Sequence, residues 1–353
     1  MENNYLIIMA GGVGSRFWPA STSEKPKQFL DMLGTGETLL QHTVKRFEHI
    51  CPKEHILVVT SDKYVDLVKQ QVPELEESNI LAEPCARNTA PCIAYATYKI
   101  HKQNPNANIV VSPADHLIVN VMLFQQEVLA GLDFTLNKDA ILTLGIQPHR
   151  PETGYGYIQT SDKNAVIAPV NAFKEKPKLE VAQEYLANGS YYWNAGIFLY
   201  KAQTMIDAFE RYNPALAAIF NNIREKLDTA EEKAVIAEVF PTCESISIDY
   251  SIMEKANNLF VQKATFSWSD LGTWTSLWEK REKLDAEKNS SSALVSKFYE
   301  STNTLVQTET INKVVVQGLH DYIVVEANGV LMICSKREEQ RIKQFVADVD
   351  SNT

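Results

Sequence analysis

The chain has 353 residues, a length that suggests one large and one small domain. Its formal net charge of −10 argues against a broad nucleic-acid-binding surface, and no apolar run is as long as a membrane span. The five cysteines are scattered without a Cys-x-x-Cys pair, which disfavours zinc ribbons and a disulfide framework. Because no basic segment followed by an apolar run opens the chain, the sequence predicts a reduced, cytoplasmic protein.

Strand-like and helix-like segments alternate through the first half of the sequence. The strand-like segments are short apolar runs, whereas the helix-like segments carry apolar residues on one side. The expected strands are Leu6–Met9, Ile56–Thr60, Asn79–Leu81 and Ile109–Ser112, and the expected helices are Thr38–Ile50, Asp62–Val72 and Thr89–His101. This alternation predicts an α/β domain whose mostly parallel sheet is covered by helices on both faces. Ligands of such folds gather at the carboxyl ends of the strands.

The pattern becomes mixed after about residue 140. The expected strands here are Ile141–Leu144, Tyr155–Gln159, Ile197–Tyr200 and Leu259–Phe266, and the expected helical segments are Leu179–Asn188 and Ala202–Glu238, the latter broken near Pro214. The polar stretch 285–292 (DAEKNSSS) predicts a linker, so we expect a large domain over residues 1–288 and a small β-rich domain over 289–353. Within the small domain, short strands over 305–335 precede a closing helix over 337–349.

A glycine-rich loop, Gly11–Arg16, follows the first expected strand. Glycines let backbone N–H groups approach a phosphate chain, and the planar cation of Arg16 suits phosphate oxygens. Lys27, after Pro26, adds a second cation. The alternative is a tight turn with surface cations. A dinucleotide fingerprint is excluded because the loop runs into Phe17–Pro19, and a P-loop is excluded because no Gly-Lys-Ser/Thr follows.

Two aspartates are candidates for a metal site. Asp115 follows the expected strand Ile109–Ser112, and Asp270 follows the strand-like segment Leu259–Phe266. Either alone would more often be a capping or turn residue. Together they suit Mg²⁺, which favours one or two carboxylates with substrate phosphates and water. His116 is expected to support this site rather than act as a base.

Four further motifs combine polar groups with turns or aromatic side chains. Glu83–Pro91 brings a cation, an amide and a hydroxyl to a helix start, where ordinary N-capping by its Asn or Thr is the alternative. Pro151–Ile158 offers a glycine turn, Phe173–Pro177 a carboxylate beside a cation, and Tyr192–Phe198 an amide beside aromatic rings. These last three motifs together offer what a sugar phosphate needs, a carboxylate and an amide for hydroxyl groups, an aromatic face and a lysine for the phosphate, although each motif alone is ordinary. Ser247–Lys255 fits a capped helix and a catalytic role equally well.

These stretches resemble the sugar-1-phosphate nucleotidyltransferase family over about residues 5–280. The sequence motif Gly11-Gly12-x-Gly14-x-Arg16-x-Trp18-Pro19, followed by Pro26–Leu30, is similar to the N-terminal motif of the mannose-1-phosphate guanylyltransferase branch. Glu83–Pro91 matches that family's nucleotide motif in every fixed position. The resemblance implies a Rossmann-like nucleotidyltransferase domain and a homodimer. For the C-terminal domain it implies a β-rich form, with a short left-handed β-helix as the candidate.

The resemblance also implies an activity: transfer of GMP from GTP to α-D-mannose 1-phosphate, with Mg²⁺, giving GDP-mannose and pyrophosphate. Two alternatives stay open, a guanylyltransferase for a heptose or fucose 1-phosphate and a non-catalytic subunit that binds sugar nucleotides. The implied catalytic residues are Arg16, Lys27, Asp115 and Asp270, and the two aspartates are the metal ligands. The implied nucleotide-binding residues are Ala10, Gly11, Gly12, Gly14, Ser15, Arg16, Lys27, Glu83, Arg87, Asn88, Thr89 and Asp115. The implied sugar-phosphate-binding residues are Gly154, Tyr155, Glu175, Lys176 and Asn194. No nucleic-acid or membrane partner is expected.

Overall fold

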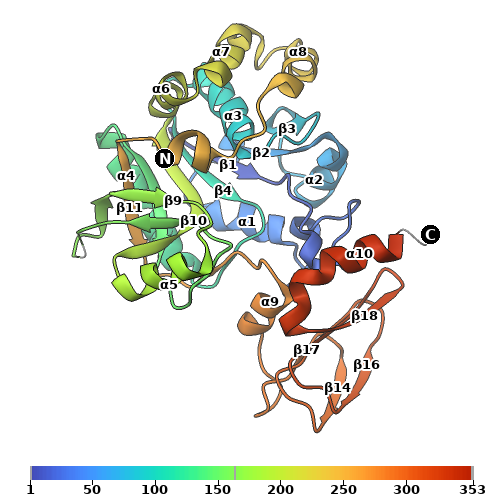
Figure 1. Cartoon of the computed structure of the whole chain (residues 1–353). Coiled ribbons are helices and arrows are strands. Elements are labelled where there is room, and N and C mark those ends of the chain that lie inside the picture. The colour runs from blue at the N-terminus through green and yellow to red at the C-terminus, as the bar shows by residue number, and fades with distance from the viewer. Residues whose placement is uncertain (1, 163, 351–353) are drawn as a thin grey trace. The chain divides into compact units, whose positions relative to one another are not determined.

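Figure 1 shows a computed structural model of the chain, which describes residues 2–162 and 164–350. The chain forms two compact units, each assembled from separated segments. The first unit contains residues 1–11, 43–114 and 118–268, and the second contains residues 12–42, 115–117 and 269–353. Within the described residues, no helix combines the length and the apolar character needed to cross a membrane.

The first unit is built on a ten-stranded mixed sheet with the order β3-β2-β1-β4-β10-β6-β11-β8, in which β7 also pairs with β10 and β9 pairs with β7. Its strands are β1 (Asn4–Met9), β2 (Ile56–Ser61), β3 (Ile80–Glu83), β4 (Asn108–Pro113), β6 (Ile141–Ile146), β7 (Tyr157–Gln159), β8 (Ile167–Pro169), β9 (Ala172–Lys174), β10 (Tyr191–Lys201) and β11 (Leu259–Ala264). Strands β1 to β4 pair in parallel, whereas the long β10 runs antiparallel to β4 and β6. The prediction of an α/β fold with a large mixed sheet is therefore confirmed.

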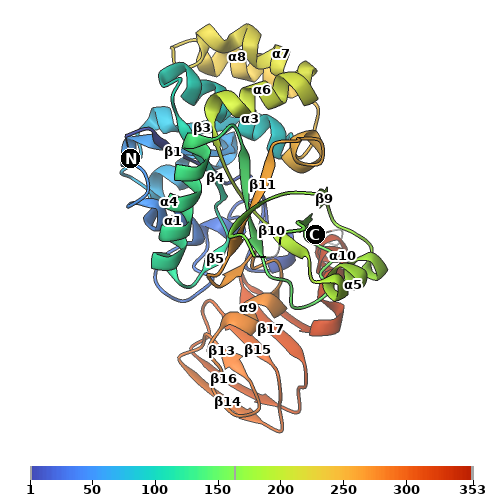
Figure 2. The same ribbon diagram turned by 90° about the vertical axis from the view of Figure 1, so that its left-hand side faces the viewer.

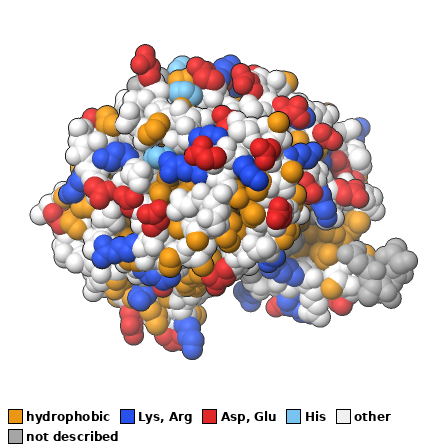
Figure 3. Space-filling view, turned by 90° about the horizontal axis from the view of Figure 1, so that it is seen from above, with side chains coloured by type: hydrophobic (Ala, Val, Ile, Leu, Met, Phe, Trp, Pro, Cys, Tyr) orange, Lys and Arg blue, Asp and Glu red, His pale blue; other side chains and the backbone are white. Residues whose placement is uncertain are grey.

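Helices cover this sheet, as Figures 1 and 2 show. They are α2 (Val65–Gln71), α3 (Thr89–Gln103), α4 (Val121–Asn137), α5 (Leu179–Asn188), α6 (Ala202–Tyr212), α7 (Pro214–Ile223) and α8 (Glu232–Val239), while α1 (Leu39–Phe47) contributes residues to both units. Short 3-10 turns connect them: η3 (Lys53–His55), η4 (Asp62–Tyr64), η5 (Glu77–Asn79), η6 (Arg224–Lys226) and η7 (Phe240–Thr242). In the view of Figure 3, acidic and basic side chains are interspersed over the surface.

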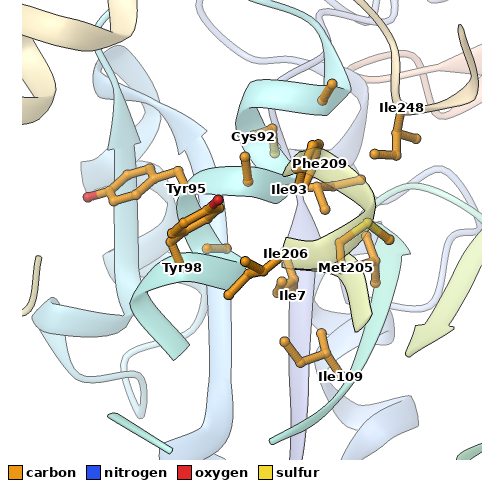
Figure 4. Close-up of a cluster of buried hydrophobic side chains, with 14 of the residues drawn as sticks. Ile7, Cys92, Ile93, Tyr95, Tyr98, Ile109, Met205, Ile206, Phe209 and Ile248 are labelled. Carbon is orange, nitrogen blue, oxygen red and sulfur yellow. The ribbon is translucent and has the colours of Figure 1, made fainter. Parts of the chain in front are cut away.

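The core of the first unit lies between the sheet and helices α3 and α6 (Figure 4). Ile7 of β1, Ile93 of α3 and Phe209 of α6 are fully buried there. Burying a side chain of this size stabilises a fold by about 1.5–3 kcal/mol relative to exposure. This packing holds α3 and the sheet together, and so positions the residues that precede α3.

The second unit contains the C-terminal strands. These strands are β13 (Ser290–Ser291), β14 (Val295–Tyr299), β15 (Leu305–Thr308), β16 (Lys313–Gln317), β17 (Tyr322–Ala327) and β18 (Val330–Ser335). Strands β13 to β17 pair in parallel, and β18 pairs antiparallel with β17. Residues 18 apart pair in parallel on three successive segments, as shown by Val295 with Lys313, Thr302 with His320 and Leu305 with Ile323. This repeat is typical of a parallel β-helix in which one coil takes 18 residues, while the first coil is shorter, because Ser290 pairs with Leu305. The predicted β-rich C-terminal region is confirmed, and its handedness stays a prediction.

Further short elements complete the second unit. They are η1 (Ser15–Phe17), η2 (Lys27–Phe29), α9 (Trp274–Lys280), η9 (Lys336–Arg341) and α10 (Ile342–Asp350). The short strands β5 (Leu117–Ile118) and β12 (Trp268–Ser269) pair with each other. Helices α4 and α9 are absent from the sequence-based expectations.

The linker predicted at 285–292 is wrong, because this stretch is folded. Asn289 is fully buried, its backbone N–H donates to Asp285 at 2.8 Å, and its amide donates to the Ser301 carbonyl at 2.8 Å. Strand β13 begins at the next residue. The polar composition therefore reflects hydrogen bonding inside a β-helix coil. The domain boundary at residue 288 stays a prediction.

Candidate active site

Two neighbouring parallel strands of the first unit lead into the predicted phosphate and metal residues. The register of β1 and β4 places Met9 beside Pro113, and the Ala114 N–H donates to the Met9 carbonyl at 3.0 Å. The Ala10 carbonyl accepts a hydrogen bond from Thr60 at 2.9 Å. The glycine loop and Asp115 therefore begin at the carboxyl ends of adjacent strands, where open α/β sheets bind ligands.

In the second unit, the carbonyl oxygens of the glycine loop are turned toward the protein. Gln28 donates its amide to the Gly12 carbonyl at 2.9 Å, and the Val13 carbonyl accepts hydrogen bonds from the Ser21 hydroxyl at 2.6 Å and the Lys27 N–H at 3.3 Å. Gly12 and Val13 are exposed. The Gly12 and Val13 carbonyl oxygens are therefore already occupied, which lowers their repulsion of an anion that approaches the loop.

Gly14 is required by the shape of this loop. Its φ is +69°, and a Cβ atom there would lie 2.5 Å from the Cβ atom of Lys27. Any larger residue would be strained and would displace Lys27. The 3-10 turn η1 starts directly after it, with Ser15 half-buried and Arg16 exposed, so the guanidinium of Arg16 is accessible to a ligand.

Lys27 joins the two predicted metal residues. It is 3% exposed, and its Nζ lies 2.9 Å from Asp115 Oδ2 and donates to the main-chain carbonyl of Asp270 at 2.6 Å. The same Nζ lies 5.4 Å from the centre of the Phe17 ring. Sequence reasoning predicted that Lys27 would hold a triphosphate and did not predict this ion pair. The structure thus gathers Lys27, Asp115 and Asp270, which lie far apart in the sequence.

The charge of Asp115 is stabilised by its neighbours. Burial would raise the pKa of this carboxyl group, but the charges of Lys27 and His116 and the hydrogen bond from Lys27 outweigh it, so the pKa is lowered. The Asp115 side chain is nevertheless 32% exposed. The Asp270 carboxylate accepts a hydrogen bond from the Gly272 N–H at 3.0 Å. Over residues 2–162 and 164–350, no cluster of three or more His, Cys, Asp or Glu side chains is arranged to hold a metal ion.

Glu83, in the first unit, is a buried carboxyl group next to the end of β1. It is 7% exposed, and its Oε2 lies 3.3 Å from the position that a Cβ atom of Gly11 would occupy. Burial raises the pKa of Glu83 to about 7, although a hydrogen bond with Cys92 lowers it in part. Its Oε1 is buried without a hydrogen-bond partner among the described residues. An unpartnered buried carboxyl oxygen is costly, and a ligand that donates N–H groups would relieve the cost.

The other predicted nucleotide-binding residues of this motif, Arg87, Asn88 and Thr89, are hydrogen-bonded within the first unit. Asn88 caps helix α3, because its side-chain oxygen accepts the Thr89 N–H at 2.9 Å. The Thr89 hydroxyl accepts the Ile248 N–H at 2.9 Å, and the Arg87 guanidinium donates to the Pro241 carbonyl. The capping alternative is thus realised at Asn88. The predicted contacts of these residues with a nucleotide stay predictions.

The predicted sugar-phosphate residues also meet in the first unit. Lys176 forms an ion pair with Glu175, and a Cβ atom on Gly156 would lie 2.5 Å from Glu175 Oε2. The Glu175 side chain is 6% exposed, whereas that of Lys176 is 60% exposed. Burial would lower the pKa of Lys176, but the hydrogen bond and the charge of Glu175 outweigh it and raise the pKa. Lys176 is therefore a cation within reach of an anionic ligand.

Aromatic rings and a glycine turn lie in the same part of the chain. The Tyr155 ring packs edge-on against Trp193 at 5.2 Å and Trp268 at 5.3 Å between centres. The Gly154 N–H donates to Glu152 at 3.0 Å, which closes the turn. The Lys176 N–H donates to the Tyr155 carbonyl at 3.2 Å, so the turn also supports the Glu175–Lys176 pair.

Asn194 is fixed by three hydrogen bonds. Its side-chain oxygen accepts from the Thr143 hydroxyl and the Gly196 N–H, both at 3.0 Å, and its amide nitrogen donates to Asp249 Oδ1 at 3.1 Å. Asp249 therefore belongs to this cluster. The sequence left its role open, because Ser247–Lys255 suited a capped helix equally well. Its position within one of the family-like motifs was the only available signal.

A model of the nucleotidyl transferase family matches residues 5–287, and the chain belongs to this family.

Individual proteins of known name also resemble the chain. The chain is 34% identical to the mannose-1-phosphate guanylyltransferase ManC of Salmonella typhimurium, over 99% of its own length and 73% of the relative's. It is also 34% identical to the alginate biosynthesis protein AlgA of Pseudomonas aeruginosa, over 98% of its length and 72% of the relative's. The crystal structure of a mannose-1-phosphate geranyltransferase from Thermus thermophilus matches 99% of both chains, with 26% identity and a TM-score of 0.87.

Proposed function

We propose that this protein transfers GMP from GTP to α-D-mannose 1-phosphate. A phosphate oxygen of the sugar phosphate attacks the α-phosphorus of GTP, the bond between the α-phosphorus and the bridging oxygen breaks, and pyrophosphate leaves with GDP-mannose as the second product. The observation that carries the proposal is the buried Lys27 with Asp115 beside the glycine loop. The choice of sugar and base is supported by relatives named mannose-1-phosphate guanylyltransferase, which are 33–34% identical to the chain.

Residues of the glycine loop bind the triphosphate in this proposal. The N–H groups of Gly11, Gly12, Gly14 and Ser15, with Ala10 before them, surround the phosphate oxygens, and Arg16 contacts the same oxygens with its guanidinium. Lys27 keeps Asp115 in place and stabilises the negative charge that grows on the phosphates during transfer. The attacking phosphate is already an anion, so no general base is needed. Positioning and charge stabilisation then supply the catalysis.

By ligand type, the carboxylates of Asp115 and Asp270 suit a Mg²⁺ ion. Asp115 is ionised and partly exposed, and Lys27 draws it toward the main chain of Asp270. Mg²⁺ commonly takes one or two carboxylates and completes its shell with phosphate oxygens and water. Bound there, the ion would neutralise charge on the phosphates. We therefore assign Asp115 and Asp270 as its ligands.

In this proposal, Glu83 and the Arg87–Thr89 segment of the first unit bind the base of the nucleotide. An ionised Glu83 accepts hydrogen bonds, and guanine offers two neighbouring N–H donors where adenine offers one donor beside an acceptor. The unpartnered Glu83 Oε1 supports this assignment. An enzyme with such a carboxyl group prefers GTP to ATP, because ATP would leave part of it unpaired.

The Glu175, Lys176 and Asn194 cluster receives the sugar phosphate in this proposal. Lys176 contacts the phosphate, while Glu175 and Asn194 hydrogen-bond to sugar hydroxyl groups. Gly154 and Tyr155 form the turn that limits the site. We further propose that the enzyme works in the cytoplasm as a homodimer.

A panel of sugar 1-phosphates tests the proposal. The purified protein is incubated with GTP, Mg²⁺ and mannose, glucose, fucose or heptose 1-phosphate, and pyrophosphate release is measured with product identification by mass spectrometry. Mannose 1-phosphate should give the highest kcat/KM. A higher value for fucose or a heptose would move the assignment to that sugar, and no release with any of them would refute the enzyme assignment.

A further inference from the structure

One segment of the first unit, residues 246–254, makes hydrogen bonds to both sets of predicted substrate residues. On the nucleotide side, the Ala90 N–H donates to the Ile246 carbonyl at 3.1 Å, and the Ile248 N–H donates to the Thr89 hydroxyl at 2.9 Å. This part of the segment therefore fixes the start of helix α3. No substrate role follows from these contacts alone.

On the sugar side, the same segment holds two other residues. The Glu254 carboxylate accepts the Glu175 N–H at 3.2 Å, and Asp249 Oδ1 accepts the Asn194 amide at 3.1 Å. Between them, η8 (Asp249–Met253) is a π-helical turn. Such turns are rare and often lie at functional sites.

The orientation of the Asn194 side-chain amide is set by its hydrogen-bond partners. Thr143 and Gly196 donate to its oxygen, which fixes the oxygen on one side, and Asp249 fixes the nitrogen on the other. Without Asp249 the nitrogen would lose its acceptor, and the amide would be held through its oxygen alone. The hydroxyl-binding orientation of Asn194 therefore depends on Asp249.

We infer that Asp249 is a positioning residue for the sugar phosphate, because it orients the Asn194 amide and, beside Glu175, sets the charge that the phosphate meets at Lys176. The inference rests on the proposed function and assigns a residue whose role the sequence left open. Asp249 acts through Asn194 and Lys176 and needs no contact with the reacting atoms.

The electrostatics of the cluster support this role. Burial and the charge of Glu175 raise the pKa of Asp249 to about 7, although Lys176 and a hydrogen bond from Ser247 lower it in part. Tyr250, in the same turn, also raises the pKa of Lys176 through its charge. Below pH 7 Asp249 carries a proton and Glu175 is the main negative charge beside Lys176. Above pH 7 a second negative charge appears there and repels the phosphate, so the KM for the sugar phosphate should rise with pH.

Two substitutions at Asp249 test the inference. Asp249→Asn keeps an acceptor for Asn194 and cannot ionise, whereas Asp249→Ala removes the acceptor. Asp139→Asn is the matched control, since Asp139 also accepts a side-chain hydrogen bond in the first unit, from Thr204 at 2.6 Å, and lies outside the cluster. The KM values for mannose 1-phosphate and GTP are measured from pH 6 to 8.5. Binding of mannose 1-phosphate alone is measured by calorimetry.

The expected results differ for each variant. Asp249→Asn should match the wild type within about twofold at pH 6 and lose most of the rise in KM toward pH 8.5. Asp249→Ala should raise the KM for mannose 1-phosphate about tenfold at pH 6, as expected for one lost hydrogen bond at a site, and should also lose most of the rise toward pH 8.5. Its KM for GTP should stay within about twofold of wild type. Asp139→Asn should follow the wild type.

Three outcomes would overturn the inference: a wild-type pH dependence in Asp249→Asn, equal losses for both substrates in Asp249→Ala, or no loss for either. If Asp249→Ala does not fold, the pH dependence of the isosteric Asp249→Asn decides alone. If the wild type converts mannose 1-phosphate and the Asp249 variants have the same KM values as the wild type, only the role of Asp249 is refuted. A wild type that neither binds nor converts mannose 1-phosphate refutes the proposed function as well.

Discussion

Replacing Lys27 by methionine removes the charge at the centre of the candidate active site while it keeps much of the side-chain volume. The substitution deletes two charge-assisted hydrogen bonds, to Asp115 Oδ2 at 2.9 Å and to the Asp270 carbonyl at 2.6 Å. Each such bond contributes about 1.5–3 kcal/mol, but the ammonium group also no longer needs to be desolvated and Asp115 is partly exposed. We therefore expect a loss of about 2 kcal/mol in the free energy of unfolding.

The effect on stability should depend on pH in a defined direction. In the wild type the folded pKa of Asp115 is lowered, so its pairing stabilises the fold above the unfolded value of about 3.9 and is lost as the pH falls through the folded pKa. The methionine variant lacks this contribution. The difference between the two proteins should therefore be largest above about pH 4 and should shrink toward pH 2.

The effect on catalysis should be larger than the effect on stability. Loss of one charge-stabilising group commonly lowers kcat by about 10²–10³-fold. Pyrophosphate release gives kcat, and urea unfolding at several pH values gives stability. Lys25→Met, which changes an exposed lysine of the same segment, is the control and should behave like wild type. A Lys27→Met variant that keeps more than about a third of the wild-type rate would refute the reasoning, as would a stability loss that is equal at low and neutral pH.

Three further predictions concern the other predicted substrate residues. Asp115→Asn and Asp270→Asn should each lower kcat at least about a hundredfold. The double variant should have about the same kcat as either single variant, because the effects of groups that act as a unit are not additive. Measuring kcat against Mg²⁺ concentration checks this, and single losses that multiply in the double variant would contradict a shared ion. Glu83→Gln should lower the ratio of kcat/KM for GTP over ATP by about tenfold or more, and an unchanged ratio would remove Glu83 from base recognition. Asn194→Ala should raise the KM for mannose 1-phosphate with GTP binding nearly intact, and equal loss of both would show that the two substrate sites are misassigned.

Much of the fold followed from local patterns in the sequence. Each expected strand from Leu6 to Ser112 is a short apolar run, and each is found within one residue or two of its predicted bounds. Helix α4 escaped prediction for a physical reason. Its buried residues include Phe124 and Val128, but Met122, Leu129 and Leu136 are exposed, so apolar residues lie on both faces and hide the helical period.

The prediction of a linker around Asn289 was wrong for a related reason. Serines, asparagine and aspartate are typical of linkers, and the same groups also satisfy the backbone inside a tightly coiled β-structure. Asn289 takes the second course, through hydrogen bonds to Asp285 and Ser301. The difference depends on which strands lie on either side of the segment, and no local pattern reports that.

The sequence by itself determined the family, because glycines, cations and carboxylates in fixed order match it over residues 5–287, and from the family it predicted which residues carry the chemistry. Only the tertiary structure decided how they meet: Lys27 contacts Asp115 and the main chain of Asp270, Asn88 caps α3, and Asp249 holds Asn194. These contacts join residues up to 243 positions apart in the sequence. Such distances are closed by strand pairing and core burial, which depend on the whole chain, so the local sequence around each residue cannot specify its partner.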